Sequence, residues 1–403
     1  MVPGGIDVNH AAPHDPFGTP PSPWRYAVKL DPFALERWMT TWELDVDFDI
    51  AESGIYPLSL DELGDLSGPS AAEELQTTLR TMRLGYSEAR GSLALRTALA
   101  MTFANATPED VLVTTGAIEA NFLLFNALLQ PGDHVVAVSP SYQQLLSVPR
   151  AITGNLTEWS VVHDDGFYYD LDELETLVTS ATRLIVINSP HNPTGAMLTR
   201  PDLERVIEIA ARSGAWVLAD EAYRWLEHPG GEKMPPPARD LGERVISVGT
   251  MSKPFGLPGL RIGWLVANPE VASACWGLRD YVSLSPSGLS DTIARFAIDH
   301  RESIWPRNSQ IIVRNMETAN AWIADNADIV SWRPPRAGLL AMLKYAADIP
   351  SMELADRLAK EVRVMLAPGS AFGLEGHLRI GVGQKPDIFA EGLQRTAAFL
   401  RNL

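Results

Sequence analysis

Lys253 lies in the stretch SVGTMSKPFGLPGLRIGW, residues 247–264, whose composition suits a reactive amine. Thr250 precedes it by three residues, Arg261 follows by eight, and glycines between them allow a ligand to approach the backbone closely. An amine becomes nucleophilic where cationic neighbours or a dry site favour loss of its proton. The hydroxyl and the guanidinium can hold a dianionic phosphate. A lysine imine beside a phosphate site indicates pyridoxal phosphate, although this stretch alone also fits a surface loop.

Two further segments supply polar groups that suit the ring of that cofactor. Asp220 ends the apolar run in VLADEAY, so its carboxylate needs a cationic partner, and a protonated pyridine nitrogen is one. Tyr223 and the amide of Asn192, in SPHNPTG, can both reach the phenolic oxygen of the ring. Taken alone, Asp220 fits a helix cap equally well.

Three other positions complete the candidate site. Gly116, Ala117 and Ile118 in TTGAIEA start an expected helix, where free N–H groups and the helix dipole favour a phosphate. Tyr142 in SPSY can stack on a planar ring, although a core position is the alternative. Arg379 in HLRIGVG can pair with the α-carboxylate of a substrate through its guanidinium, or lie in solvent on an edge strand.

The elements that must position these residues follow an α/β pattern. Short apolar runs alternate with helical stretches up to about residue 290, which predicts a mostly parallel seven-stranded sheet flanked by helices. The expected strands are VLVTT, HVVAVS, LTEWSVV, RLIVIN, AWVLAD, RVISVG and RIGWLVA. Most of the candidate residues directly follow one of these runs, and ligands bind at the carboxyl ends of such strands. Later helices, at 290–305, 314–326 and 351–362, and short strands indicate a smaller α+β domain.

The order and spacing of these motifs resemble the class I/II aminotransferase family of fold-type I pyridoxal phosphate enzymes, over roughly residues 30–400. The resemblance rests on YSEARGSLALR, TTGAIEA, PSY, NPTG, DEAY, SKPFGLPGLRIGW and RIG. It implies a homodimer with shared sites, to which Tyr86 contributes by reaching the phosphate bound in the neighbouring subunit. The chain is accordingly expected to divide into an arm (1–35), a large cofactor-binding domain (70–290) and a small domain (36–69 with 291–403).

The resemblance also implies a role for each residue. Lys253 corresponds to the Schiff-base lysine and general base, and Asp220 to the partner of the pyridine nitrogen. The other implied roles are phenolic-oxygen binding by Asn192 and Tyr223, ring stacking by Tyr142, phosphate binding by Thr250, Arg261 and the Gly116–Ile118 backbone, and carboxylate binding by Arg379.

The segment LERWMTTWELDVDFDIAESGIYPLSLDEL, residues 35–63, is more acidic than the usual entry loop of the family. It is similar to a subgroup from antibiotic pathways that includes capreomycidine synthase and the pyridoxal phosphate arginine oxidases. Gly54 and Ile55 match backbone that approaches the substrate carboxylate. Our hypothesis is that Glu52 or Asp49 binds a cationic substrate group such as a guanidinium; alternatively both are solvated or cap a helix.

These features predict an enzyme acting at Cα of an amino acid. Transamination with a 2-oxo acid acceptor is the expected reaction, and elimination, replacement, cyclisation or oxidation in natural-product biosynthesis is the alternative. A pyridoxal-phosphate-binding regulatory domain is disfavoured, because the Pro-rich first 35 residues are too short for a DNA-binding module.

Composition limits the other classes of function. The chain has 403 residues and a formal charge of −17, which argues against nucleic acid or an anionic membrane as a partner. The single cysteine, Cys275, excludes an internal disulfide and a cysteine-based metal cluster, and no metal site is expected. With no apolar run long enough to span a membrane and no secretory signal, the expected location is the cytoplasm.

Overall fold

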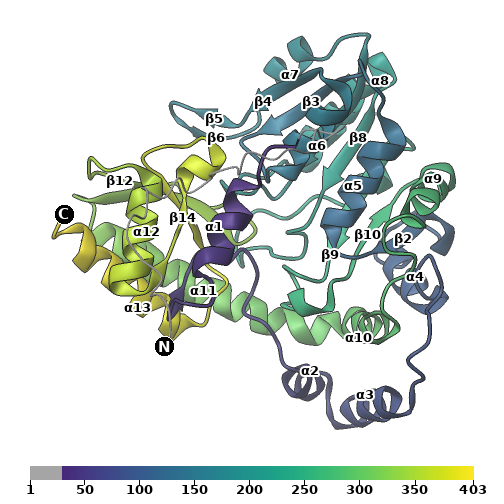
Figure 1. Ribbon diagram of the computed structural model, residues 1–403, viewed down its shortest axis with the longest axis horizontal. Coiled ribbons are helices and arrows are strands. Elements are labelled where there is room, and N and C mark those ends of the chain that lie inside the picture. Colours follow the sequence, from purple (N-terminus) through teal and green to yellow (C-terminus); the bar gives the residue numbers. More distant parts are fainter. Residues whose placement is uncertain (1–29) are drawn as a thin grey trace, which may run out of the picture.

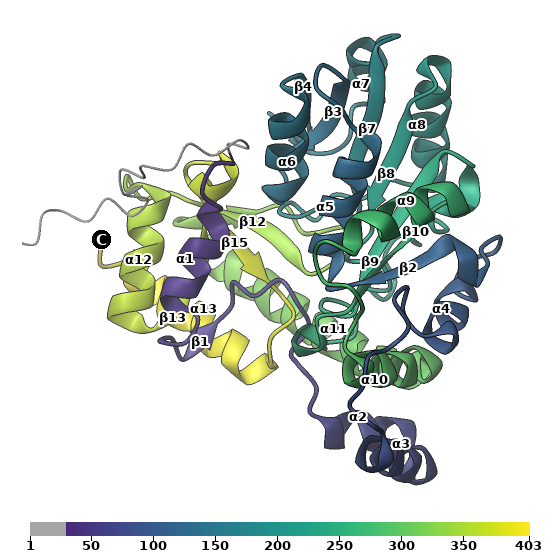
Figure 2. The same cartoon turned by 45° about the vertical axis from the view of Figure 1, so that its right-hand side comes forward.

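The computed structural model describes residues 30–403, so most of the expected N-terminal arm lies outside the described residues. Two lobes are visible in Figure 1 and Figure 2, one built on a seven-stranded sheet and the other on a four-stranded sheet. The long helix α11 (Arg301–Asp325) runs from below the larger sheet into the smaller lobe. The domain boundaries expected from the sequence stay a prediction.

The larger sheet consists of the seven strands that the apolar runs predict. Its spatial order is β2-β10-β9-β8-β7-β3-β4. The strands are β2 (Val111–Thr114), β3 (His134–Ser139), β4 (Leu156–Ser160), β7 (Thr182–Asn188), β8 (Trp216–Asp220), β9 (Val245–Thr250) and β10 (Gly263–Val266). Only β10 is antiparallel to its neighbours, β2 and β9. The predicted fold class, a fold-type I arrangement with a mostly parallel sheet, is confirmed.

Helices cover both faces of this sheet, which explains why its strands are apolar almost throughout. The helices α5 (Ala117–Leu128), α6 (Gln144–Thr153) and α9 (Pro269–Arg279) pack on one face. On the other face, α7 (Leu171–Leu177) and α8 (Arg200–Ser213) cover β3, β7 and β8. Beside β2 and β10, the buried residues of α4 (Leu93–Ala100) and α10 (Gly288–Asp299) form a further cluster.

The smaller sheet has the order β11-β12-β15-β14 and is antiparallel throughout. Its strands are β11 (Val330–Trp332), β12 (Leu340–Tyr345), β14 (Ala367–Pro368) and β15 (His377–Gly381), and α12 (Ser351–Val362) and α13 (Pro386–Leu400) pack against it. Helix α1 (Ala34–Trp42) joins the same core, and the indole N–H groups of Trp38 and Trp42 both donate to Asp356 Oδ1 at 2.9 Å. The N-terminal helix is thereby fixed to the smaller lobe.

The remaining elements are short or lie apart from both sheets. The helix pair α2 (Leu60–Ser67) and α3 (Pro69–Thr81) projects away from the larger lobe (Figure 2). The other pairings are β1 (Phe48–Asp49) with β13 (Val364–Met365), and β5 (Val162–His163) with β6 (Gly166–Phe167). The single helix expected over 290–305 is wrong, because His300 leaves helical geometry (φ −106°, ψ 18°) and separates α10 from α11.

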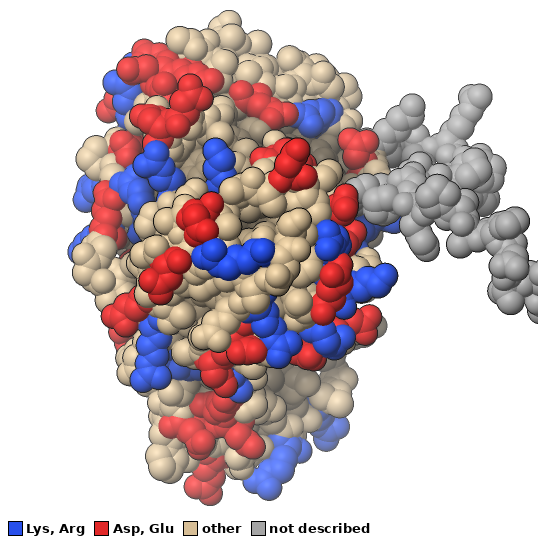
Figure 3. Space-filling view, turned by 90° about the vertical axis from the view of Figure 1, so that its left-hand side faces the viewer, with Lys and Arg blue, Asp and Glu red and all other residues tan. Residues whose placement is uncertain are grey.

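The surface of the smaller lobe carries acidic and basic side chains interspersed with one another, as Figure 3 shows. Within residues 30–403, no helix combines the length and the apolar character needed to cross a lipid bilayer. In the same part of the chain, no three His, Cys, Asp or Glu side chains are grouped as ligands for a metal ion.

Candidate active site

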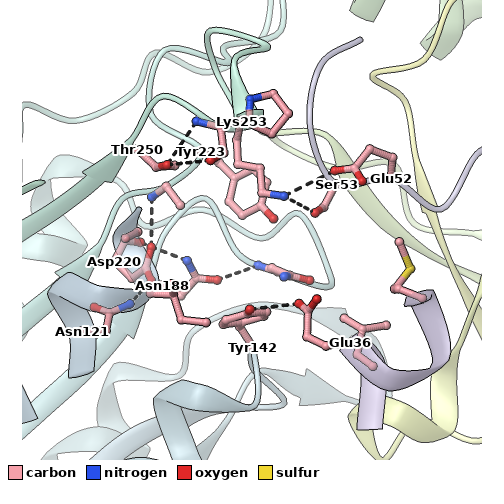
Figure 4. Close-up of a pocket in the computed structure, with 18 of the residues that line it drawn as sticks. Glu36, Glu52, Ser53, Asn121, Tyr142, Asn188, Asp220, Tyr223, Thr250 and Lys253 are labelled. Atoms are coloured by element: carbon pink, nitrogen blue, oxygen red, sulfur yellow. Dashed lines mark hydrogen bonds and ion pairs between the residues drawn. The ribbon is translucent and has the colours of Figure 1, made fainter. Parts of the chain in front are cut away.

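A cavity of about 420 Å³ lies at the carboxyl ends of the large-sheet strands, and α1 forms one of its walls. Figure 4 shows the side chains that converge on it. The structure brings together eleven residues that the sequence singles out, namely Glu52, Ala117, Ile118, Tyr142, Asn192, Asp220, Tyr223, Thr250, Lys253, Arg261 and Arg379. Five other candidates, Asp49, Gly54, Ile55, Tyr86 and Gly116, do not line the cavity.

Lys253 points from the loop after β9 towards the loop that precedes α2 (Figure 4). Its Nζ donates to Ser53 Oγ at 2.6 Å and lies 3.4 Å from Glu52 Oε1. Burial disfavours the charged amine, but Glu52, Tyr223 and Glu36 together outweigh this and raise the pKa of Lys253, with Glu52 contributing most among the three. The positive charge of Lys253, in turn, lowers the pKa of Glu52. The amine is therefore held in its charged form until Glu52 is neutralised or a ligand displaces it.

Asp220 occupies the buried end of β8. Its Oδ2 accepts a hydrogen bond of 2.8 Å from Asn121 Nδ2, and its Oδ1 accepts one of 3.0 Å from the Ala222 N–H. Asn188 Nδ2 also donates to the Asp220 backbone carbonyl at 3.0 Å. Burial raises the pKa of Asp220 to about 6 in spite of these donors. A buried carboxylate of this kind is stabilised by a cationic partner such as a protonated ring nitrogen.

Arg379 enters the cavity from β15 of the smaller lobe and is 1% exposed. Its Nη1 donates to Asn192 Oδ1 at 3.2 Å and its Nη2 to the Ala51 carbonyl at 2.9 Å. The guanidinium also lies over the ring of Phe372, 5.2 Å from the centroid. Within residues 30–403 its Nε has no hydrogen-bond partner. A buried cation with a free donor is suited to bind an anionic group.

The opposite end of the cavity lies at the start of α5. Gly116 has φ +78°, and a Cβ there would approach Arg261 Nη2 to 2.6 Å, so glycine is needed for the guanidinium to lie against this turn. Thr250 Oγ1 lies 3.1 Å from Ser252 Oγ. Backbone N–H groups at a helix start, two hydroxyls and one guanidinium form a site for a phosphate.

Helix α1 closes the cavity from the smaller lobe. The Tyr142 hydroxyl donates to Glu36 Oε1 at 2.9 Å, and the Ala34 N–H donates to Gln143 Oε1 at 2.8 Å. Burial, followed by the charge of Glu36, raises the pKa of Tyr142, which stays protonated. Because α1 also packs in the core of the smaller lobe, these two contacts join the lobes at the mouth of the cavity.

The candidates outside the cavity wall have identifiable positions. The Gly54 N–H donates to Glu52 Oε1 at 2.9 Å, and the Ile55 N–H donates to the Lys253 carbonyl at 3.3 Å. Both groups therefore fix the loop against Lys253, and their contact with a substrate stays a prediction. Tyr86 is 93% exposed and does not line the cavity of its own subunit.

Sequence reasoning missed several residues that line the cavity. Asn121 is a buried amide in the apolar helix α5, whereas Asn126 of the same helix is exposed, and an amide at a core-facing position is a signal that could have identified it. Asn188 ends the strand β7, where its Oδ1 accepts the Asn192 N–H at 2.7 Å. Ser53 and Glu36 had no distinguishing pattern, because their contacts are with residues far away in the chain.

Comparison with known proteins identifies the class. The sequence profile of the family described as aminotransferase class I and II matches residues 58–395. The chain belongs to this family, and it is a pyridoxal 5'-phosphate-dependent enzyme.

Among curated relatives, capreomycidine synthase of Streptomyces vinaceus is 33% identical over 86% of this chain and 88% of its own. Arginine–pyruvate transaminase of Pseudomonas aeruginosa is 27% identical over 83% and 88%. A PLP-dependent aminotransferase structure from Streptococcus suis is similar with a TM-score of 0.88, at 33% identity over 93% of this chain and 98% of that one. The structure of a PLP-dependent cyclase, OrfR, gives a TM-score of 0.85 at 34% identity, over 94% and 100%.

The cavity fits this cofactor at each of its functional ends. The glycine turn beside Arg261 suits the phosphate, buried Asp220 suits the ring nitrogen, and the Lys253 amine can bond to the aldehyde carbon. Among the residues described, Asn121 Oδ1 and Arg379 Nε are buried without a hydrogen-bond partner, so an acceptor and a donor near the site are free to bind a ligand.

Proposed function

We propose that this enzyme is an aminotransferase for an α-amino acid whose side chain carries a cationic group. The observation that carries the proposal is the distribution of charge in the cavity. Arg379 is available to the α-carboxylate of the substrate. In addition to Asp220, which we assign to the ring of the cofactor, three carboxylates, those of Glu36, Glu43 and Glu52, line the same cavity. A cationic side chain could pair with one of these carboxylates, and a guanidinium binds a carboxylate through two parallel hydrogen bonds.

Asp49 adds to the negative charge beside the cavity. Burial and the charge of Glu52 raise the pKa of Asp49 to about 6, although its Oδ1 accepts the N–H groups of Ala51 and Glu52. A carboxyl group with this pKa binds a proton readily or pairs with a cation. The name of one relative, arginine–pyruvate transaminase, agrees with a basic amino acid as donor and a 2-oxo acid as acceptor.

In this proposal each residue has a defined task. When bound, the cofactor supplies an electron sink that acidifies the α-proton of the substrate. Lys253 would hold the cofactor through its amine, and the free amine would take up the α-proton of the substrate at Nζ. Asp220 keeps the ring nitrogen protonated, and Asn121 holds that carboxylate in place. Arg379 orients the substrate through its carboxylate.

The remaining proposed contacts hold the cofactor itself. Asn192 and Tyr223 bind its phenolic oxygen, and Tyr142 stacks on its ring. Thr250, Arg261 and the backbone of Gly116, Ala117 and Ile118 hold its phosphate. The backbone of Gly54 and Ile55 faces the substrate carboxylate.

We also propose that the protein is a homodimer in which Tyr86 reaches the phosphate of the neighbouring subunit. An exposed set of apolar side chains supports this proposal. They are Leu84, Tyr86, Ile118, Phe122, Tyr281, Val282 and Leu284, each at least 39% exposed. Ile118 is both part of this apolar set and part of the cavity wall, so a partner that covers the set would lie beside the cofactor site.

Cyclisation with elimination is the second candidate reaction. The relatives that favour it are capreomycidine synthase and the PLP-dependent cyclase, at 33% and 34% identity. The contact of Glu52 with Lys253 suits it as well, because this pair of groups can accept and return protons near Cα and Cβ of a substrate.

An isotope experiment separates the two reactions. The holoenzyme is incubated with arginine, lysine, leucine or glutamate, each labelled with ¹⁵N at the α-amino group, together with pyruvate. Transamination of a basic amino acid predicts ¹⁵N-alanine from arginine or lysine, and at least tenfold less from leucine and glutamate. The proposal would be overturned by preference for a neutral or acidic donor. It would also be overturned if a β-hydroxylated basic amino acid, added to the panel because its hydroxyl can leave as water, gave a dehydrated or cyclised product that retains the α-nitrogen instead of ¹⁵N-alanine.

A further inference from the structure

Arg279, the last residue of α9, is a fully buried arginine outside the cavity. It has 0% exposure, and its side chain contacts three separate segments of the chain. The Nε donates to Ser283 Oγ at 3.0 Å and lies 3.8 Å from Glu119 Oε2. The Nη1 donates to the Ala89 carbonyl at 2.7 Å. Burying a guanidinium is costly unless it is paired, so each of these contacts has a stabilising role.

The contact of Arg279 with Glu119 leads to the phosphate end of the cavity. Glu119 is in the first turn of α5 and is 7% exposed. Its Oε2 accepts the Thr115 N–H at 2.5 Å, which fixes the turn between β2 and α5. Its Oε1 accepts the Ser283 hydroxyl at 2.5 Å. An unpaired carboxylate here would repel a phosphate at the same helix start, and the charge of Arg279 offsets that repulsion.

The contact of Arg279 with the Ala89 carbonyl leads to the segment that carries Tyr86. The Ala89 carbonyl is held by Arg279, and the Ser87 hydroxyl donates to the Pro286 carbonyl at 2.5 Å. Residues 84–89 and 281–286 are thus joined to each other and to α5. Both segments carry exposed side chains of the apolar set defined above, including Tyr86 and Tyr281.

We propose that Arg279 is a positioning residue for the phosphate group of the cofactor. Through Glu119 it fixes the Thr115–Ile118 turn of its own subunit. Through Ala89 it fixes the segment from which Tyr86 extends towards the phosphate of the second subunit. This second effect rests on the proposed homodimer, whereas the first requires one chain only.

Binding of two cofactor forms to the apoprotein tests this role without turnover. Wild type and Arg279→Gln are titrated with pyridoxal 5'-phosphate and with pyridoxal, which lacks the phosphate, and tryptophan fluorescence is followed. For Arg279→Gln we expect at least a tenfold loss of affinity for the phosphorylated form and less than a twofold change for pyridoxal. Arg295→Gln, whose side chain is 52% exposed and pairs with Asp299, serves as the matched control and should change neither.

Glu119→Gln covers the case in which Arg279→Gln does not fold. In this variant an NH₂ group replaces one of the two acceptor oxygens, so the side chain can no longer accept from both the Thr115 N–H and the Ser283 hydroxyl. Because the removed charge could only have repelled the phosphate, the selective loss that we expect would come from the less firmly held turn. Equal losses for both ligands, or no loss in either variant, would overturn the proposal.

Sedimentation of the same samples separates the two effects. If wild type is a monomer, the contribution through Tyr86 is refuted and the selective loss must come from Glu119 alone. The substrate proposal is unaffected by either outcome, because no amino acid is present.

Discussion

Glu52 places a carboxylate oxygen 3.4 Å from the Nζ of Lys253, across a gap of 201 positions in the sequence. The lysine follows β9 of the larger lobe, whereas Glu52 precedes α2 and adjoins Ala51, whose carbonyl accepts from Arg379 of the smaller lobe. The Glu52 carboxylate thus contacts Lys253 and also acts electrostatically on Arg379, the two cations that we expect to bind cofactor and substrate. This position affects both the reactivity of the amine and the choice of substrate.

Replacing Glu52 should make the lysine more reactive towards the cofactor. Because Glu52 raises the pKa of Lys253, the change Glu52→Gln lowers this pKa and increases the neutral fraction of the amine at pH 8. The expected increase is about tenfold in the rate at which apoprotein bonds to pyridoxal phosphate. Stopped-flow absorbance measures this rate. Glu74→Gln, an exposed residue of α3, should leave it unchanged; a slower rate in Glu52→Gln would contradict the assignment.

The same variant should also change substrate preference. Loss of a charged partner for the distal cation costs about 1.5–3 kcal/mol, so kcat/KM for arginine should fall by about tenfold or more. The value for leucine should fall by much less, because its side chain makes no charged contact. Initial rates with the two amino acids give the ratio. An unchanged ratio would remove Glu52 from the substrate site, since any general effect on Lys253 acts on both substrates.

Asp49→Asn should stabilise the apoprotein, and more so at higher pH. Burial raises the folded-state pKa of Asp49 to about 6, against about 3.9 in an unfolded chain, so the ionised group destabilises the fold above that range. The contribution of Asp49 to the free energy of unfolding therefore decreases as pH rises from about 4 through 6. The advantage of Asn, whose Oδ1 can still accept from Ala51 and Glu52, should be about twice as large at pH 8 as at pH 5. Thermal unfolding at both pH values tests this, and an advantage confined to pH 5 would reverse the sign.

Asn121→Ala should weaken cofactor binding through Asp220. The Asn121 amide lowers the pKa of Asp220, so its removal favours the protonated carboxyl group, which holds a protonated ring nitrogen less well. A hydrogen bond to a charged group contributes about 1.5–3 kcal/mol, and we expect at least a tenfold loss of affinity at pH 7. The matched control is Asn126→Ala, since its amide bonds only to the Phe122 carbonyl of the same helix. Equal affinities in the two variants would remove Asn121 from the site.

Much of the fold could be predicted because the large sheet is covered on both faces. Strands such as β3 and β7 are therefore continuous apolar runs, and the residues after them must gather at one edge of the sheet. Tyr142, Asp220 and Lys253 were predicted in this way to lie close together, and they line the same cavity. The helix boundary at His300 was missed because the apolar periodicity continues across it, and no Pro or Gly marks the break.

The contacts of the N-terminal loop could not be predicted from the pattern. The hydrogen bond that Lys253 donates to Ser53 and the one that Trp38 donates to Asp356 join residues 200 and 318 positions apart. They depend on how the two lobes pack, which no local periodicity reports. Arg279 belongs to the same category, because its three partners come from three different segments.

The covalent bond between Lys253 and pyridoxal phosphate is the central claim, and peptide mapping after borohydride reduction tests it most directly. Cofactor-saturated protein is reduced and digested, and the phosphopyridoxyl mass is located by tandem mass spectrometry. We expect one modified peptide, with the label on Lys253, and no label on that peptide in the Lys253→Ala variant. A label on another lysine, or an unmodified Lys253 in saturated wild-type protein, would contradict it.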